Sequence, residues 1–371
     1  MVLQTLQLVH FKNYAQAQFQ FATKLNILVG DNGMGKTNVL DAIHTLCLTK
    51  SHFGIPDKQL IQHDADFFRL DGIFHKNGNT EHIVVKQAAT KKKVLEQNGV
   101  PYTRLSEHIG LLPVVMLTPD DPYQLLDASE DRRRLIDLSI VQYNSAYTQD
   151  LTAYNKVLEQ RNALLKQNLQ GKIPAIDPTL IEIYDHELTR RADAIHAARA
   201  EWIAEVLPLF GVYYNKIAQI NEGVGLVYSS SLATQNLYDD LQRTRARDFA
   251  LGRTTVGIHK DDLLFTLRGQ PIKRYASQGQ LKSFVLALHL AAAEHLHQKT
   301  SVMPILLLDD IFDKLDPQRI KNLLTLLHES NFGQLFVTDT DPLRLLNAVA
   351  AIDNTAPTLF EIINGQAFIK K

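Results

Sequence analysis

The segment Gly30–Asn38 constrains this chain more than any other part of its 371 residues. Glycines at 30, 33 and 35 precede Lys36 and Thr37, after an apolar stretch at 25–29 and before a helix-compatible stretch at 37–48. Because glycine tolerates positive φ, the backbone can turn tightly enough for several N–H groups to face one anion, and a helix start adds partial positive charge. The pattern predicts a phosphate-binding loop in an α/β domain.

The residue types in this loop suggest ATP with Mg²⁺ as the ligand. Lys36 would reach the β- and γ-phosphates, and the Thr37 hydroxyl would hold the metal ion. We expect the nucleotide to contact Gly30, Asp31, Asn32, Gly33, Met34, Gly35, Lys36, Thr37 and Asn38.

A pair of acids follows an apolar run in the last third of the chain. Pro304 precedes four aliphatic residues and then Asp309 and Asp310. A strand that is buried on both faces has this pattern, and its polar residues emerge at the carboxyl edge of the sheet. Asp309 is therefore the expected Mg²⁺ ligand. Asp310 is the expected base that activates water, although it is one methylene shorter than the glutamate that ABC-type ATPases usually carry there.

The segment Tyr275–Gln280 fits an ABC-type signature at the start of a helix. The Ser277 hydroxyl and free N–H groups at a helix start would suit a γ-phosphate, and Gly279 and Gln280 complete the motif. In such ATPases the signature serves a nucleotide held by another copy of the domain. We therefore expect an ATP-dependent homodimer whose catalytic residues are Lys36, Asp309, Asp310 and, from the neighbouring copy, Ser277.

The middle of the chain reads as helical. Residues 130–170 are helix-compatible, Gly171–Pro174 interrupt them, and a second helix is predicted to start at Asp177 and Pro178. Because the nucleotide motifs lie on both sides, the predicted fold is a discontinuous α/β ABC-type P-loop ATPase head with an inserted α-helical hairpin arm. The predicted bounds are 1–125 and 253–371 for the ATPase domain and 126–252 for the arm.

Composition and charge limit the other possibilities. The net charge of −1 gives no overall attraction to nucleic acid, so a DNA site would have to be a local patch. The candidates are basic clusters, at Lys91, Lys92 and Lys93, at Arg132–Arg134, and at Arg190, Arg191 and Arg199. The single cysteine excludes a disulfide framework, and no apolar stretch approaches the ~20 residues of a membrane helix, so we expect a cytoplasmic protein without a membrane partner.

The chain resembles the RecF family of bacterial DNA replication and repair ATPases, which are related to SMC and Rad50 heads. The resemblance runs nearly end to end, through Phe11–Tyr14, Gly30–Asn38, Asp41–Ile43, Thr118–Asp121, Arg132–Asp137, Gly257–Asp262, the signature and the two acids. The chain departs from the family's usual residues at Asp41, at His52 and Phe53, at Ile258 and at Lys260.

The resemblance implies a function in recombinational repair and replication restart, as part of the SOS response to DNA damage. It implies a weak DNA-stimulated ATPase that dimerises with ATP on double-stranded DNA beside a single-stranded gap and is released by slow hydrolysis. It also implies that RecO and RecR act with it to load RecA. Where many ABC-type ATPases place a histidine, this chain has Asp339–Asp341, which indicates either slow hydrolysis or a different residue in that role.

Three other functions share part of the pattern. A cytoplasmic ATPase subunit of an ABC transporter would carry all three motifs, but with a much shorter segment between Lys36 and the signature. A small-molecule P-loop kinase would share the phosphate loop alone. The sequence is also compatible with a structural DNA-binding protein that binds ATP without significant hydrolysis.

Overall fold

The computed structural model describes residues 1–173, 176–312, 317–329, 332–342 and 357–370. The chain divides into two compact units. Unit 1 comprises 1–122, 212–221 and 277–371, and unit 2 comprises 123–211 and 222–276. These bounds differ from the predicted domains, because 253–276 fall in unit 2 and 212–221 fall in unit 1. The assignment of functions to these segments stays a prediction.

The first sheet of unit 1 carries the nucleotide motifs. Its strands follow the order β15-β14-β3-β13-β12-β8. The pairs from β14 through β8 are parallel, and β15 adds an antiparallel edge. The strands are β3 (Leu25–Val29), β8 (Val114–Leu117), β12 (Ile305–Leu308), β13 (Leu335–Asp339), β14 (Thr358–Ile363) and β15 (Gln366–Lys370). Every residue of β12 is buried, as its run of aliphatic residues predicts.

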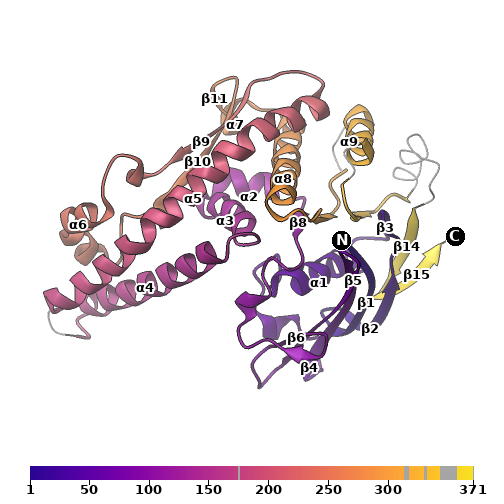
Figure 1. The fold of residues 1–371 in the computed structure, drawn as a ribbon, viewed down its shortest axis with the longest axis horizontal. Coiled ribbons are helices and arrows are strands. Elements are labelled where there is room, and N and C mark those ends of the chain that lie inside the picture. Colours follow the sequence, from indigo (N-terminus) through magenta and orange to yellow (C-terminus); the bar gives the residue numbers. More distant parts are fainter. Residues whose placement is uncertain (174–175, 313–316, 330–331, 343–356, 371) are drawn as a thin grey trace. The chain divides into compact units, whose positions relative to one another are not determined.

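The second sheet of unit 1 is antiparallel, in the order β2-β1-β4-β5-β6-β7. Its strands are β1 (Val2–Phe11), β2 (Tyr14–Gln20), β4 (Phe67–Lys76), β5 (Asn79–Ala88), β6 (Val94–Gln97) and β7 (Val100–Pro101). Apolar side chains alternate along β1 and β4, as expected of strands with one buried face. Helix α1 (Lys36–Leu48) contacts strands of both sheets (Figure 1).

The other helices of unit 1 flank these sheets. They are α8 (Gln278–Thr300), α9 (Pro317–Glu329) and the short turns η1 (Asp57–Leu60) and η2 (Leu105–Glu107). Most of α8 is buried, which explains its almost uniformly apolar sequence between Leu281 and Ala293. Within the described residues, no helix is long and apolar enough to cross a membrane.

Unit 2 is mostly helical. Its elements are α3 (Ser129–Ile140), α4 (Ser145–Leu169), α5 (Pro178–Ala218), α6 (Leu237–Leu251), α7 (Ile272–Tyr275), η3 (Ser231–Ala233), η4 (Ile258–Lys260), β9 (Val224–Ser229), β10 (Asp262–Leu267) and β11 (Gln270–Pro271). Helix α2 (Asp121–Asp127) starts in unit 1, and the C-terminal residues of α5 also belong to unit 1. Helices α4 and α5 run side by side (Figure 1).

Two features of the predicted hairpin can be compared with the structure. The start of α5 at Pro178 confirms the predicted helix start. The predicted continuous helix over 130–170 is wrong, because α3 ends at Ile140 and α4 begins at Ser145. Asn144 sets the second start, since its side chain accepts a hydrogen bond of 2.9 Å from the N–H of Tyr147.

A buried ionic network joins three helices of unit 2. Arg161 of α4 is fully buried and donates to Asp185 of α5 at 2.9 Å. It also donates to Asp248 of α6 and to Thr254, both at 2.8 Å. Buried charges need such partners, since an isolated one would cost several kcal/mol. Helical periodicity alone gave no sign of this network, because it identifies apolar faces rather than paired charges.

Arg199 forms a second buried centre in unit 2. Its guanidinium donates to the carboxylate of Asp137 at 2.9 and 3.0 Å and to the carbonyl of Ile258 at 2.8 Å. Arg132 binds Asp262 with two nitrogens, at 2.6 and 3.0 Å, and Arg133 donates to the carbonyl of Asp261 at 2.6 Å. The partners named for these arginines all lie in unit 2. Arg199, with a side chain only 2% exposed, is therefore not a DNA contact as sequence analysis had allowed.

His259 lies at the edge of this network and is held neutral. Its Nε2 is 3.3 Å from the carbonyl oxygen of Thr254, which can only accept, so Nε2 carries the proton. Its Nδ1 then accepts from the Tyr154 hydroxyl at 3.0 Å. Burial lowers the pKa of His259 to about 4. The folded state therefore disfavours the charged ring.

This environment predicts a pH dependence. Because the pKa of His259 is lower in the folded chain than in the unfolded chain, its contribution to stability is complete above the unfolded value of ~6.5. The contribution, ~3 kcal/mol, should be lost as the pH falls from about 6.5 through about 4. Urea unfolding monitored by the fluorescence of Trp202, the single tryptophan and a buried residue of unit 2, measures it.

His259→Gln should flatten this part of the pH profile. The control is His63→Gln in unit 1, whose side chain is 93% exposed and which should leave the Trp202 transition unchanged at every pH. If the stability of the wild type and of His259→Gln fell equally as the pH was lowered, the pH dependence could not be attributed to His259.

Candidate functional site

The phosphate loop joins β3 to α1 at the carboxyl edge of the parallel sheet. Gly35 is the N-cap of α1, with φ of 114°, and Lys36 is the first helical residue. The Lys36 ammonium folds back over the loop and donates to the carbonyls of Gly30 at 2.6 Å and Asp31 at 2.9 Å. Burial lowers the pKa of Lys36, and the nearby Asp310 and Asp309 oppose that change. The loop therefore holds a buried cation beside two acids.

Two glycines of the loop, both with positive φ, leave little room for a side chain. At Gly30, with φ of 147°, a Cβ would lie 2.4 Å from the carbonyl oxygen of Ile362. At Gly35 a Cβ would lie 2.6 Å from Nδ2 of Asn13. The sequence argument for these glycines concerned backbone freedom, and the structure adds close approach by neighbouring atoms as a second requirement.

Asn13, in the turn between β1 and β2, and Tyr14, the first residue of β2, brace the loop. Asn13 donates from Nδ2 to the carbonyl of Met34 at 3.0 Å and accepts from Nδ2 of Asn38 at 2.8 Å. The Tyr14 hydroxyl donates to the carbonyl of Gly35 at 3.0 Å. Sequence analysis had noted these residues only as part of the resemblance and had assigned them no role. Their position where the turn leads into a second strand was the available signal, since turns at sheet edges commonly carry functional side chains.

The two acids emerge from β12 beside the loop. The Thr37 hydroxyl is 2.8 and 3.0 Å from the two carboxylate oxygens of Asp309, which is 4% exposed. The Thr338 hydroxyl donates to Asp309 Oδ1 at 2.6 Å. Burial raises the pKa of Asp309, and the hydrogen bonds from Thr338 and Thr37 oppose the rise.

A hydroxyl and a carboxylate at this spacing fit Mg²⁺, which prefers hard oxygen ligands and usually binds through one or two carboxylates. Within the described residues, no group of three or more histidine, cysteine, aspartate or glutamate side chains could hold a metal by itself. The expected metal residues, Thr37 and Asp309, are thus brought together, as partners that would share the ion with phosphate oxygens.

The signature residues form the start of α8. The Ser277 hydroxyl accepts from the N–H of Gln280 at 3.2 Å, and the Gln280 side chain accepts from the N–H of Ser277 at 2.8 Å. This reciprocal pair is a capping box. Ser277 is exposed, and a Cβ on Gly279 would lie 2.5 Å from a guanidinium nitrogen of Arg319. The segment Asp313–Asp316, which follows the two acids closely in the chain, lies outside the described residues.

Asp41 of α1, one departure from the family pattern, is the centre of a buried cluster. Its carboxylate is 2.7 Å from the Lys12 ammonium and accepts from the Ser51 hydroxyl and the His52 N–H, both at 2.8 Å. Lys12 also lies 5.2 Å from the centre of the Phe53 ring. The aspartate therefore holds the segment at 51–53 and the first hairpin against the nucleotide helix.

The basic residues suggested for DNA differ in availability. Lys91 and Lys92 are exposed in the connection between β5 and β6, whereas Lys93 is largely buried and binds Asp57 at 2.6 Å. In unit 2, Arg190 is exposed and 2.8 Å from Glu187, and Arg191 binds Asp150 at 2.9 Å. Lys93 and Arg191 thus have structural roles that the sequence pattern could not reveal.

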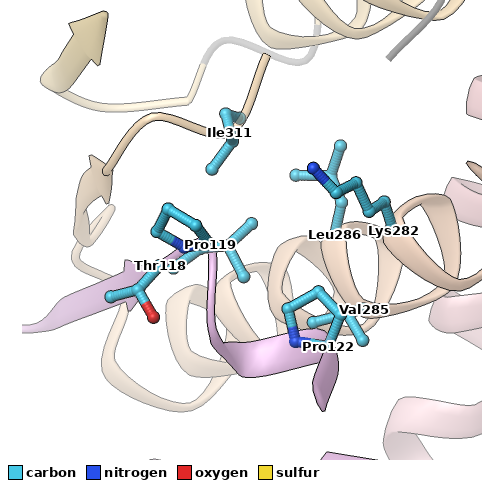
Figure 2. Close-up of a pocket in the computed structure, with 8 residues that line it drawn as sticks. Thr118, Pro119, Pro122, Lys282, Val285, Leu286 and Ile311 are labelled. Atoms are coloured by element: carbon cyan, nitrogen blue, oxygen red, sulfur yellow. The ribbon is translucent and has the colours of Figure 1, made fainter. Parts of the chain in front are cut away.

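A small cavity in unit 1 lies near the acids but differs from the phosphate site (Figure 2). Its lining residues come from the end of β8, the following turn, the start of α2, α8 and the residue after Asp310. They are Leu117, Thr118, Pro119, Pro122, Lys282, Val285, Leu286 and Ile311. Because this lining is mainly apolar, the cavity suits packing between the turn and α8 rather than phosphate binding.

The loop geometry generates a prediction for Gly30→Ala. The added Cβ would displace either the loop or the Ile362 backbone, so the affinity for ATP should fall by at least roughly tenfold. Fluorescent-nucleotide titration measures the affinity, and circular dichroism checks the fold. Gly78→Ala is the matched control, because Gly78 also has positive φ, at 82°, but has open space around it. Equal nucleotide affinity in both variants would contradict the prediction.

Comparison with known proteins agrees with this geometry. A family model described as RecF/RecN/SMC N terminal domain matches residues 2–355. The protein named DNA replication and repair protein RecF from Flavobacterium johnsoniae is 43% identical over 93% of this chain and 95% of its own length. The RecF protein of Porphyromonas gingivalis is 38% identical over 99% of this chain and 100% of its own.

Solved structures show the same fold. One described as the recombination mediator protein RecF-ATPrS in the RecFOR pathway has a TM-score of 0.88 and 25% identity, and it covers 100% of this chain and 98% of its own. An Smc head domain from Pyrococcus furiosus, at 16% identity and a TM-score of 0.56, shares the fold. The predicted ABC-type head and the resemblance are thus confirmed, and the chain belongs to the RecF family.

Proposed function

We propose that this chain is an ATP-hydrolysing DNA replication and repair protein that acts on DNA as an ATP-dependent dimer. The observation that carries the proposal is the convergence of Lys36, Thr37, Asp309 and Asp310 at one edge of the parallel sheet. The full-length match to proteins named for DNA replication and repair supports repair rather than transport as the purpose.

The residues divide the work of phosphoryl transfer. Lys36, which now donates to two loop carbonyls, would exchange them for the β- and γ-phosphates of ATP. Thr37 and Asp309 would hold Mg²⁺, which supplies charge neutralisation at the phosphates. Asp310 would orient the attacking water and accept its proton. Because phosphoryl transfer depends mainly on positioning and electrostatics, these residues, together with the signature of a second chain, would supply the groups that hydrolysis needs.

The signature supports assembly of two copies. Ser277 is exposed, and its hydroxyl lies at the start of a helix of 23 residues, where N–H groups and the helix dipole favour an anion. Each chain carries one phosphate loop and one signature. A two-fold dimer would therefore complete two nucleotide sites, each with the signature of the opposite chain.

The proposed target is double-stranded DNA beside a single-stranded gap. A related structure is described as a recombination mediator in the RecFOR pathway, which supports RecO and RecR as partners and RecA loading as the outcome. Dimer closure would place basic groups of two chains around one duplex, so weak patches would act together. Lys91, Lys92 and Arg190 are the exposed candidates for these contacts.

A second candidate is an ATP-binding DNA protein without significant hydrolysis. The observation that favours it is chemical: Asp310 is a short acid, and Asp339–Asp341 occupy the position where a histidine is usual in many ABC-type ATPases. Measured turnover of ATP by the purified chain, with single-stranded, double-stranded and gapped DNA, decides between the two.

Three variants should give three phenotypes. Lys36→Ala should abolish tight ATP binding, Ser277→Ala should retain binding by the monomer but lose the dimer, and Asp310→Asn should bind and dimerise but hydrolyse slowly. Nucleotide titration, light scattering with ATP and Mg²⁺, and phosphate release measure these steps.

Ser277→Ala also removes a helix cap, which costs ~0.5–2 kcal/mol by itself. Asn236→Ala is therefore the control, because Asn236 caps α6 in unit 2 and should leave dimer formation intact. If Ser277→Ala weakened ATP binding by the monomer as much as Lys36→Ala does, the role toward the neighbouring chain would be wrong.

DNA binding should depend on both nucleotide and salt. The double variant Lys91→Glu with Lys92→Glu should weaken DNA binding with ATP by tenfold or more and reduce the salt slope. Lys93 is left unchanged, because its reversal would disrupt the pair with Asp57. Reversal of the exposed Lys50 and Lys58 is the control with the same change in charge. DNA binding that does not depend on nucleotide would contradict the proposal that an ATP-bound dimer closes around the duplex. An equal loss of DNA affinity in both double variants would contradict a specific role for Lys91 and Lys92.

A further inference from the structure

Thr338 lies at the end of β13, between the strand that leads to the phosphate loop and the strand that leads to the acids. The strand order is β3-β13-β12, and the three strands are parallel, so their carboxyl ends meet at one edge. Thr338 is 0% exposed. A buried hydroxyl at this edge requires polar partners. Its partners are the carboxylate of Asp309 and the backbone N–H of Asp310.

One hydroxyl contacts both neighbouring residues. Thr338 Oγ1 donates to Asp309 Oδ1 at 2.6 Å and accepts from the backbone N–H of Asp310 at 2.9 Å. Since a hydroxyl has one proton and two lone pairs, both bonds can exist together. Thr37 contacts the same Asp309 carboxylate from the phosphate loop. Two threonines, Thr338 of β13 and Thr37 at the start of α1, therefore fix the orientation of this acid.

The backbone at Asp310 makes the second bond important. Asp310 has φ of 42°, in the left-handed region that is strained for most residues other than glycine. Such a conformation persists where surrounding contacts hold it, and the Thr338 hydroxyl binds the N–H of this residue. An aspartate has two side-chain torsions with which to place its carboxylate, one fewer than glutamate. The backbone at position 310 therefore largely sets where the carboxylate lies.

We propose that Thr338 is a positioning residue that holds both acids of the nucleotide site in their working geometry. Without its hydroxyl, Asp309 would lose one of the bonds that orient its carboxylate, and Asp310 would be free to leave the left-handed conformation. The effect on turnover rests on the proposed ATPase function, whereas the effect on backbone geometry does not.

The test compares Thr338→Val with Thr338→Ser. Valine has nearly the shape of threonine but makes neither bond, whereas serine keeps the hydroxyl. Thr338→Val should lower kcat by tenfold or more with little change in ATP affinity measured in EDTA, and Thr338→Ser should stay within about threefold of the wild type. Thr103→Val, at an exposed threonine between β7 and η2 of unit 1, is the control and should leave both quantities unchanged.

A double-variant cycle tests whether Thr338 acts through Asp310. Combined with Asp310→Asn, Thr338→Val should slow hydrolysis no further, because the group that it positions is already altered. Additive losses would overturn that part of the proposal. So would a normal kcat in Thr338→Val.

Crystal structures of the two variants provide a readout that is independent of activity. In Thr338→Val, Asp310 should leave the left-handed region and the Asp309 carboxylate should rotate, whereas Thr338→Ser should keep both as in the wild type. Unchanged Asp309 and Asp310 in the valine variant would overturn the proposal even if the wild type hydrolysed no ATP. If the wild type hydrolysed no ATP but Thr338→Val showed the expected rearrangement, the proposed ATPase function would be refuted and the positioning role of Thr338 would stand.

Discussion

The nucleotide site depends on a hydrogen bond between residues that are 272 positions apart, from the Thr37 hydroxyl to the Asp309 carboxylate. It joins the start of α1 to the end of β12, and the parallel pairing of β3, β13 and β12 brings these ends to one edge. This bond requires the Asp309 carboxylate to be buried, and burial raises the pKa of that carboxyl group. Functional sites often retain such unfavourable burial, because the same low-polarity environment strengthens electrostatic interactions with a ligand.

Positively charged residues serve two purposes in this chain. Arg161 and Arg199 are buried and neutralise carboxylates inside unit 2. Lys36 is also buried, but it donates to backbone carbonyls that a phosphate can replace. The distinction follows from the partners: a cation bound to buried carboxylates cannot leave without stranding them, whereas a cation on neutral carbonyls can be redirected at a much smaller cost. A cluster of basic residues in the sequence therefore says little about nucleic acid until their partners are known.

Local patterns predicted well the elements whose causes are local. The strand at 25–29, the start of the second long helix at Pro178 and the cap at Ser277 all follow from residues adjacent in sequence. The predicted unbroken helix over 130–170 failed because an apolar period continues through the turn at 141–144, where Asn144 starts a new helix. The roles of Lys93 and Arg191 were equally hidden, since Asp57 and Asp150 are distant in sequence.

The sequence by itself determined the type of chemistry: glycines before Lys36 and Thr37, two acids after an aliphatic strand, and a capped helix start at Ser277 each require only neighbouring residues. The tertiary structure decided which of these groups touch and what supports them. Asn13 beneath the loop, Asp41 paired with Lys12, and Thr338 between the two acids depend on strand order and register. Those contacts join segments that are far apart along the chain, and a period of 2 or 3.6 residues carries no information about which distant strands become neighbours.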